Sequence, residues 1–359
     1  MKKKTTVSLV LGSGGARGLA HIGIIRWLEE NNFEIKSISG CSMGALVGGI
    51  YATGKLAIFE QWITEISKLD IFFLLDITWK SGGFVQGDKI INTLIELFGD
   101  QDIETLPIKF TAVAADIENG KEVWMDEGSL FEAIRASISL PLFFTPVTRN
   151  GAKLIDGGVL NPVPIAPTFR DDTDITIAVN LDSAVDVRLN NKIPQDKELV
   201  NNETKIEENP NLELDFGPEK EPLRMQIQNI KDSLQAFQKP IYQAVETAVE
   251  STLANEKISL MSLRISDYML RFKSKSPLPK SREWSAYEVI NLAFDTMQSA
   301  IARQKLAAYP PDYTIEIARN TCKILEFERG QEMISLGYDK AEEFLAGHFD
   351  CKQKSEAPE

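Results

Sequence analysis

One serine of this chain stands between two glycines, in the segment GCSMG at residues 40–44. An apolar segment that reads as a strand, residues 35–40, precedes it, and a small-residue helical segment, residues 43–53, follows it. Gly-x-Ser-x-Gly at a strand-to-helix turn lifts the serine hydroxyl to the carboxyl edge of a sheet. The segment therefore predicts that Ser42 is a nucleophile, and a serine N-cap in a glycine-rich packing turn is the alternative.

A second glycine-rich segment, GSGGARG at residues 12–18, follows the apolar residues 6–11, which read as a buried strand. It does not match the dinucleotide-binding pattern Gly-x-Gly-x-x-Gly, because Arg17 stands where the third glycine belongs, and it lacks the Gly-Lys-Ser/Thr of a phosphate loop. Its row of backbone N–H groups suits an oxyanion hole, where fixed donors stabilise a tetrahedral intermediate. An ordinary tight turn is the alternative.

A serine nucleophile needs a base beside it, and the chain has only two histidines, His21 and His348. His348 precedes the polar C-terminal tail and is expected on the surface. His21 follows the glycine loop and is expected to hydrogen-bond the loop backbone. A third segment, LIDGGVLNPVP at residues 154–164, places Asp156 before two glycines. Taken alone this segment reads as an Asp-Gly turn, and taken with the other two it supplies a base.

Strand and helix patterns alternate along the chain, which predicts an α/β layer structure with a largely parallel sheet. The segments that read as strands are residues 6–11, 35–40, 108–117, 174–181 and 313–320. The segments that read as helices are residues 19–32, 43–53 and 285–308, with a closing helix pair at 329–345.

The middle of the chain has a different composition. Residues 196–222 carry nine acidic against three basic side chains, which predicts a solvated or disordered loop. Residues 225–262 show an amphipathic helical pattern. We therefore expect one catalytic domain over residues 1–345, with an acidic loop and helical insertion at about 186–285, and a polar tail over 346–359.

The overall composition excludes several kinds of protein. The 359 residues carry a net charge of −13, and an acidic chain is a poor non-specific binder of nucleic acid. The three cysteines are far apart and form no metal-binding pattern, so neither a metal nor another cofactor is expected. The N-terminal apolar run is too short for a signal peptide, and no run approaches the roughly 20 residues of a membrane span. We expect a cytoplasmic protein.

The three motifs, in this order, resemble the bacterial branch of the patatin-like phospholipases. Further blocks that look like the family are GLAHIG at 18–23, RASISLPLFFTPV at 135–147 and NPVP at 161–164. The resemblance covers residues 6–183 well and about 312–345 more loosely, whereas residues 186–262 match no known block. It implies a three-layer α/β/α fold and a lipid or phospholipid substrate, with transient contact to a membrane surface and no calcium requirement.

The resemblance also implies a Ser–Asp dyad of Ser42 and Asp156 that works through an acyl-enzyme. The residues it implies for the oxyanion hole are Gly12, Ser13, Gly14, Gly15 and Met43. Of these, the Gly14 and Gly15 amides would hold the oxyanion, Gly12 and Ser13 would shape the turn, and Met43 would add a donor. The supporting residues are Arg17, Gly18, His21, Gly40, Gly44, Gly157 and Gly158. Arg17 would orient the loop or attract a lipid phosphate, and its position within the loop favours the first role.

Two other functions remain open at this point. One is a weakly active or inactive regulatory protein that keeps the fold and binds lipid. The other is a nucleotide-binding α/β protein, and Arg17 and the missing phosphate-loop lysine argue against it. Residues 69–87 could form a lid and residues 141–144 could line an acyl channel, although ordinary core packing is favoured for both.

Overall fold

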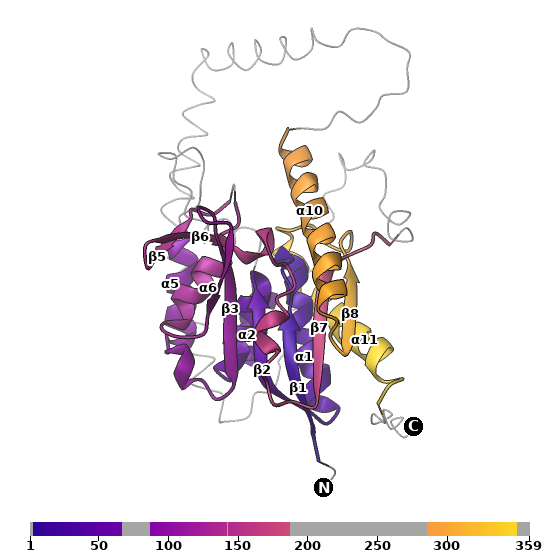
Figure 1. Ribbon diagram of the computed structural model, residues 1–359. Coiled ribbons are helices and arrows are strands. Elements are labelled where there is room, and N and C mark those ends of the chain that lie inside the picture. The colour runs from indigo at the N-terminus through magenta and orange to yellow at the C-terminus, as the bar shows by residue number, and fades with distance from the viewer. Residues whose placement is uncertain (1–2, 67–86, 142, 187–285, 350–359) are drawn as a thin grey trace, which may run out of the picture. The chain divides into compact units, whose positions relative to one another are not determined.

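The computed structural model describes residues 3–66, 87–141, 143–186 and 286–349 (Figure 1). The chain divides into two compact units, residues 1–202 with 290–359 and residues 203–289. The described residues lie in the first unit, apart from the first turn of the helix that begins at Ala286. The expected insertion at about 186–285, the apolar segment 69–87 and the end of the polar tail fall outside the described residues.

Eight strands form one sheet in the order β5-β6-β3-β2-β1-β7-β8, and β4 pairs with β3 beside this path. Their bounds are β1 Thr5–Leu11, β2 Phe33–Cys41, β3 Lys109–Asp116, β4 Lys121–Met125, β5 Val147–Arg149, β6 Ala152–Asp156, β7 Ile175–Ser183 and β8 Tyr313–Ala318. Strands β3, β2, β1, β7 and β8 are parallel, whereas β4, β5 and β6 make antiparallel pairs. The predicted largely parallel sheet is confirmed.

Helices connect the parallel strands. The α-helices are α1 Ala20–Glu30, α2 Met43–Ala52, α3 Leu56–Glu65, α5 Asp88–Phe98, α6 Leu130–Ser137, α10 Ala286–Ala308 and α11 Gly330–Leu345. The 3₁₀ turns are η1 Gly15–Leu19, η3 Ile103–Thr105, η4 Gly157–Val159, η5 Ala166–Thr168 and η7 Phe327–Arg329. Ser42 and the glycine loop at residues 12–18 therefore each lie where a parallel strand ends and a helix begins. This places both at the carboxyl edge of the sheet.

The central strand β1 separates the helical layers. Neighbouring residues of a strand point to opposite faces of the sheet. Leu11 packs against Gly48 of α2, whereas Val10 belongs to a buried cluster that contains Ala302 of α10. Helices α2 and α10 thus cover opposite faces, with β1 between them (Figure 1). This is the α/β/α arrangement that the sequence predicts.

Helices α1 and α11 contact each other through their backbones (Figure 1). A Cβ atom on Gly23 would lie 1.9 Å from the Ile334 carbonyl oxygen, and one on Gly337 would lie 2.0 Å from that of Ala20. The prediction of a helix pair at 329–345 is wrong, because α11 runs continuously through Gly337. This glycine serves close packing instead of ending a helix.

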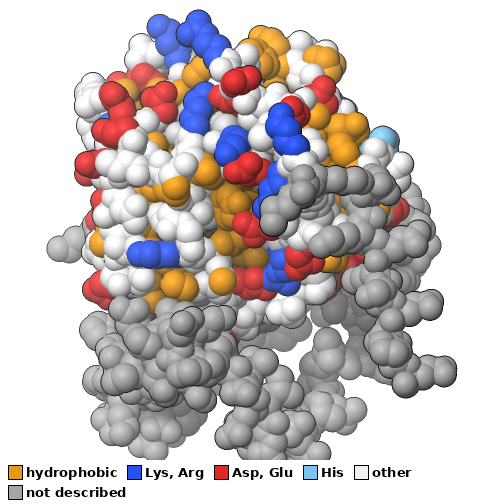
Figure 2. Space-filling view, turned by 90° about the horizontal axis from the view of Figure 1, so that it is seen from below, with side chains coloured by type: hydrophobic (Ala, Val, Ile, Leu, Met, Phe, Trp, Pro, Cys, Tyr) orange, Lys and Arg blue, Asp and Glu red, His pale blue; other side chains and the backbone are white. Residues whose placement is uncertain are grey.

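Of the helices in the described ranges, none combines the length and the apolar composition that a bilayer crossing requires. Figure 2 shows the face on the side of the N-terminus, where acidic and basic side chains are interspersed around apolar ones. The described atoms of this face carry no continuous field of one charge.

Candidate active site

Ser42 occupies a strained turn between β2 and α2. Its φ of 54° and ψ of −123° lie in a region that non-glycine residues rarely adopt. A Cβ on Gly40 would lie 2.4 Å from the Gly44 carbonyl oxygen, and a Cβ on Gly44 would lie 2.0 Å from that of Leu11. The two glycines are therefore required by backbone contacts, and the turn places the Ser42 hydroxyl at the end of the strand.

The Ser42 hydroxyl donates to Asp156, which ends β6. The distance from Ser42 Oγ to Asp156 Oδ2 is 2.5 Å, across 114 residues of sequence. The other carboxylate oxygen, Oδ1, accepts from the Gly158 amide at 2.8 Å and from the Cys41 thiol at 3.8 Å. One oxygen therefore faces the hydroxyl while the other is held by neighbouring donors, which fixes the orientation of the carboxylate.

Asp156 is fully buried. Desolvation raises the pKa of its carboxyl to about 6, although hydrogen bonds from Ser42, Gly158 and Cys41 oppose the shift. A raised pKa makes a carboxylate a stronger base, as proton abstraction from a hydroxyl requires. The burial that makes Asp156 basic comes from the fold and not from its neighbours in the sequence.

Ser137 at the end of α6 was not among the residues predicted from the sequence. Its hydroxyl accepts from the Ser42 amide at 2.9 Å and donates to the Val113 carbonyl of β3 at 2.6 Å. This buried link ties the strained turn to the neighbouring strand and removes the Ser42 amide as a free donor. Ser137 lies in the family-like block 135–147, but that block does not indicate this role, because Ser137 reaches Ser42 only through the packing of α6.

The first two amides of the glycine loop are used within the fold. The Gly12 amide donates to the Val179 carbonyl at 3.1 Å, and the Ser13 amide donates to the Pro162 carbonyl at 2.8 Å. These bonds join the loop to β7 and to the segment after β6. They fit a role in shaping the turn and leave neither amide available to a substrate.

The next amides are differently placed. In the described part of the chain, no backbone acceptor pairs with the Gly14 or Gly15 amide at this turn, nor with the Met43 amide in the first turn of α2. Gly15 and Met43 line one cavity with Ser42, and Gly14 lines a second cavity that also reaches Ser42. Gly14, Gly15 and Met43 thus offer amide donors without a backbone acceptor at the cavities that reach the hydroxyl.

His21, in the first turn of α1, is fully buried, and desolvation lowers its pKa to about 4. The imidazole is therefore neutral at physiological pH, and its Nε2 donates to the Gly12 carbonyl at 2.9 Å. This contact holds the loop backbone. His348 lies instead at the end of α11, where its Nδ1 contacts the Phe344 carbonyl, and it makes no contact with Ser42.

Arg17 clamps the loop from inside the protein. Its guanidinium donates to the Gly14 carbonyl at 3.1 Å, to the Arg319 carbonyl at 2.6 Å and to Asp182 Oδ1 at 3.0 Å. The side chain is 1% exposed. These bonds use the guanidinium within the fold, so the geometry favours the loop-orienting role over attraction of a lipid phosphate. Burial raises the pKa of Asp182 to about 6 even beside this arginine.

Three further glycines allow close approach of backbone segments around the site. A Cβ on Gly18 would lie 2.3 Å from Met43 Cβ, which joins η1 to the start of α2. A Cβ on Gly157 would lie 2.3 Å from the Val113 carbonyl oxygen, and one on Gly158 would lie 2.2 Å from Gln298 Nε2. The Gly18 and Gly157 positions exclude a larger side chain, whereas at Gly158 the nearest atom is the movable end of the Gln298 side chain.

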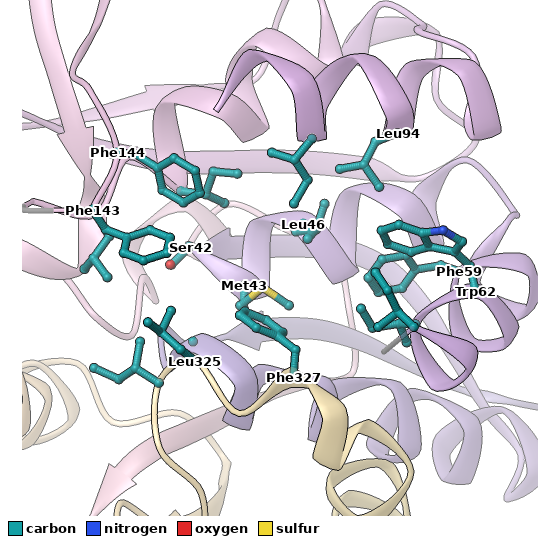
Figure 3. A pocket seen from close by; sticks show the side chains of 17 residues that line it. Ser42, Met43, Leu46, Phe59, Trp62, Leu94, Phe143, Phe144, Leu325 and Phe327 are labelled. Carbon is teal, nitrogen blue, oxygen red and sulfur yellow. The ribbon is translucent and has the colours of Figure 1, made fainter. Parts of the chain in front are cut away.

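An apolar cavity of about 130 Å³ opens beside Ser42. Apolar cavities of about 150 Å³ admit small hydrocarbon ligands such as benzene. In Figure 3 the Ser42 hydroxyl lies near Phe143 and Phe144, while Phe59 and Trp62 lie toward the other end. The preference for core packing at residues 141–144 was wrong for both phenylalanines, because they form the cavity wall. Leu142 lies outside the described residues.

A second cavity of about 30 Å³ reaches Ser42 from the side of α10. Its lining includes Ser13, Gln298 and the backbone of Gly14 beside apolar side chains, so it is mixed in character where the first cavity is almost wholly apolar. Gln298 was missed in the sequence analysis. The sequence pattern that could have indicated it is a polar residue on the buried face of an amphipathic helix, where glutamine is uncommon because it is usually exposed.

The described ranges hold no group of three or more His, Cys, Asp or Glu side chains arranged as metal ligands. The cysteines that the structure describes, Cys41 and Cys322, are buried free thiols. The chemistry available at Ser42 is therefore that of a hydroxyl, a buried carboxylate and backbone donors.

Comparisons with known proteins give the family. A family model described as Patatin-like phospholipase matches residues 9–169, which include Ser42 and Asp156. An uncharacterised NTE family protein of Mycobacterium tuberculosis is 35% identical over 332 residues, which cover 92% of this chain and 89% of that protein. Lysophospholipase NTE1 of Saccharomyces cerevisiae is 31% identical over 188 residues, which cover 50% of this chain and 11% of that protein.

The crystal structure of VipD from Legionella pneumophila aligns with 96% of this chain and 67% of that chain, with a TM-score of 0.46 and 14% identity. The mycobacterial relative matches almost end to end at an identity that establishes common descent. This chain belongs to the NTE family of patatin-like phospholipases.

Proposed function

We propose that this protein is a serine acyl hydrolase that cleaves fatty-acyl ester bonds of lipids through an acyl-enzyme on Ser42. The observation that carries the proposal is the 2.5 Å hydrogen bond from the Ser42 hydroxyl to the buried Asp156 carboxylate, beside an apolar cavity. The curated fungal relatives are named lysophospholipases. A lysophospholipid, with one acyl chain, is therefore the first substrate to test.

In the acylation step, Ser42 Oγ attacks the ester carbonyl carbon while Asp156 Oδ2 accepts its proton. The carbonyl oxygen becomes an oxyanion, and the unpaired Gly14, Gly15 and Met43 amides stabilise it. The intermediate collapses when the bond to the alcohol oxygen breaks, and that oxygen takes the proton from Asp156. The acyl chain remains as an ester on Ser42, in contact with the apolar cavity.

Hydrolysis is expected to fall at acid pH with the titration of Asp156. Only the ionised carboxylate accepts the serine proton, and burial raises its pKa to about 6. The rate constant kcat/KM should therefore decrease about tenfold for each pH unit below 6 and reach a plateau above pH 7. A pH profile with a soluble p-nitrophenyl ester measures this limb. An acid limb near pH 4 would contradict the assignment of a desolvated base.

The proposal is tested by covalent labelling together with fatty-acid release. A fluorophosphonate probe should label wild type, with the adduct on Ser42, and the protein should release fatty acid from lysophosphatidylcholine micelles. Ser42→Ala should abolish both signals. Ser39→Ala is the matched control, because Ser39 lies three residues earlier in β2 and its buried hydroxyl has no partner among the described residues.

A wild-type protein that is neither labelled nor active, with or without lipid vesicles, would refute the proposal and favour a lipid-binding protein without turnover.

We also propose that turnover needs no calcium, because this chain itself supplies the base and the oxyanion donors. Excess EDTA should therefore leave the rate unchanged.

A further inference from the structure

Gln298 is a buried polar side chain that the motifs do not include. It lies on the inward face of α10 and is 3% exposed. Its Nε2 contacts Ser13 Oγ at 3.4 Å, which is long for an N–H···O hydrogen bond. Helix α10 is also held in place beyond this contact, since Ser299 donates to the Asp182 carbonyl at 2.8 Å and Lys305 pairs with Glu122 at 2.5 Å. The position of Gln298 is therefore set by several independent bonds.

Gln298, Ser13 and Asp156, the proposed base, all have polar atoms close to Gly158. A Cβ placed on Gly158 would lie 2.2 Å from Gln298 Nε2, 2.7 Å from Ser13 Oγ and 3.1 Å from Asp156 Oδ1. Three polar atoms from three distant parts of the chain thus surround the same glycine. The Gln298 amide and the Ser13 hydroxyl therefore lie near the carboxylate, on the side of its Oδ1 oxygen.

The cavity in front of these groups is small, and polar groups share its lining with Leu140, Phe294 and Ile324. Its volume is about 30 Å³, and its lining includes Ser13, Gln298, Ser42 and the backbone of Gly14 and Gly15. About 10–15 Å³ suffices for one water molecule, which also needs two to four polar partners. The cavity meets both conditions for one or two waters, and it is too small for a glycerol headgroup or an acyl chain.

We infer that Ser13 and Gln298 position the water that attacks the acyl group on Ser42. The inference rests on the proposed function and adds to it the residues that serve the second half-reaction. In the acyl-enzyme the acyl chain occupies the apolar cavity. The acyl carbon is bonded to Ser42 Oγ, where the two cavities meet. Water held by the Gln298 amide and the Ser13 hydroxyl therefore lies outside the apolar cavity and attacks one face of the planar ester carbonyl.

The step balances with groups already present. The water oxygen forms a bond to the acyl carbon while one of its protons passes to the Asp156 carboxylate. The tetrahedral intermediate collapses when the bond between the acyl carbon and Ser42 Oγ breaks, and Oγ takes the proton from Asp156. A fatty acid leaves, and both residues return to their starting states.

The test separates acylation from deacylation with p-nitrophenyl butyrate in rapid-mixing experiments. The p-nitrophenolate leaving group needs no proton, so acylation gives a burst of colour that does not depend on the positioned water. For Gln298→Met, which keeps the chain length and removes the amide, we expect a burst rate within about twofold of wild type. The steady-state rate should fall about 10- to 100-fold, the scale of a misplaced reactant.

Ser13→Ala is the second variant, because it removes a hydroxyl from the same cavity without changing α10. It should show the same split between burst and steady state. Gln304→Met is the matched control, since Gln304 is exposed on the same helix. The double variant should lose less than the product of the two single losses, because both residues act on one water.

Two results would overturn the inference while leaving the proposed function intact. One is an unchanged steady-state rate in Gln298→Met. The other is an equal fall of burst and steady-state rates, which would assign these residues to acylation or to general packing. Absence of both fluorophosphonate labelling and fatty-acid release in wild type would instead refute the proposed function, and the inference with it.

Discussion

Asp156→Asn is expected to reduce turnover by about 10³- to 10⁴-fold while it stabilises the folded protein at pH 8. The amide is nearly isosteric, so its oxygen can accept from the Gly158 amide and its nitrogen can donate to Ser42 Oγ. It cannot accept the serine proton, and loss of a general base has an effect of about this size. Initial rates of ester hydrolysis measure the loss.

The gain in stability follows from the burial of Asp156. Its pKa is about 6 in the folded protein, against about 3.9 for an unfolded chain, so ionisation opposes folding. Protonated Asp156 contributes stability that is fully present below pH 3.9 and is lost as the pH rises through 6. Asparagine does not ionise. It should therefore raise the free energy of unfolding by about 3 kcal/mol at pH 8 and only about 1 kcal/mol at pH 4.5.

Urea denaturation of wild type and Asp156→Asn at the two pH values tests this sign. Asp126→Asn, at an exposed position, is the control and should change neither activity nor stability. If Asp156→Asn proves inactive but less stable at pH 8, the carboxylate contributes net stability through its hydrogen bonds. If it keeps substantial activity, Asp156 is not the base.

Gly337→Ala is expected to destabilise the protein by about 1–2 kcal/mol, because the cost of overpacking exceeds the gain in helix propensity. In an unhindered helix this change gains about 1 kcal/mol, because alanine has the higher helix propensity. Here the new Cβ would lie 2.0 Å from the Ala20 carbonyl oxygen, so α11 must move away from α1. Overpacking of a close interface costs about 1–3 kcal/mol or more.

The displacement should also reach the active site, since Ala20 precedes His21, which holds the Gly12 carbonyl. We expect a lower melting temperature and a lower kcat/KM in the same variant. Gly347→Ala is the control, because a Cβ there meets no atom within 4 Å. A stable, fully active Gly337→Ala protein would contradict the close backbone contact between these helices.

The local parts of the site could be predicted from sequence because each depends on backbone geometry within a few residues. Gly40 and Gly44 mark the turn at Ser42, since any side chain there would overlap backbone atoms. The strand-to-helix alternation likewise predicted the layers and the parallel strands. The closing helix pair was predicted wrongly because a glycine inside a helix and a glycine between two helices look alike in sequence.

Other parts could not be predicted because they depend on contacts between distant segments. Ser137 reaches the Ser42 amide across 95 residues, and Gln298 reaches Ser13 across 285. Serine and glutamine at such positions carry no pattern of their own. The acidic loop and helical insertion at about 186–285 stays a prediction from composition.

By itself the sequence determined the order of the three motifs, the strained turn at Ser42 and the alternation that builds the sheet. Tertiary structure alone decided that Asp156 reaches Ser42 at 2.5 Å, that its carboxyl is buried enough to have a pKa of about 6, and that an apolar cavity and a smaller, partly polar cavity meet at the hydroxyl. The physical reason is that backbone conformation is a local property, whereas desolvation and cavity shape depend on every segment packed around a group.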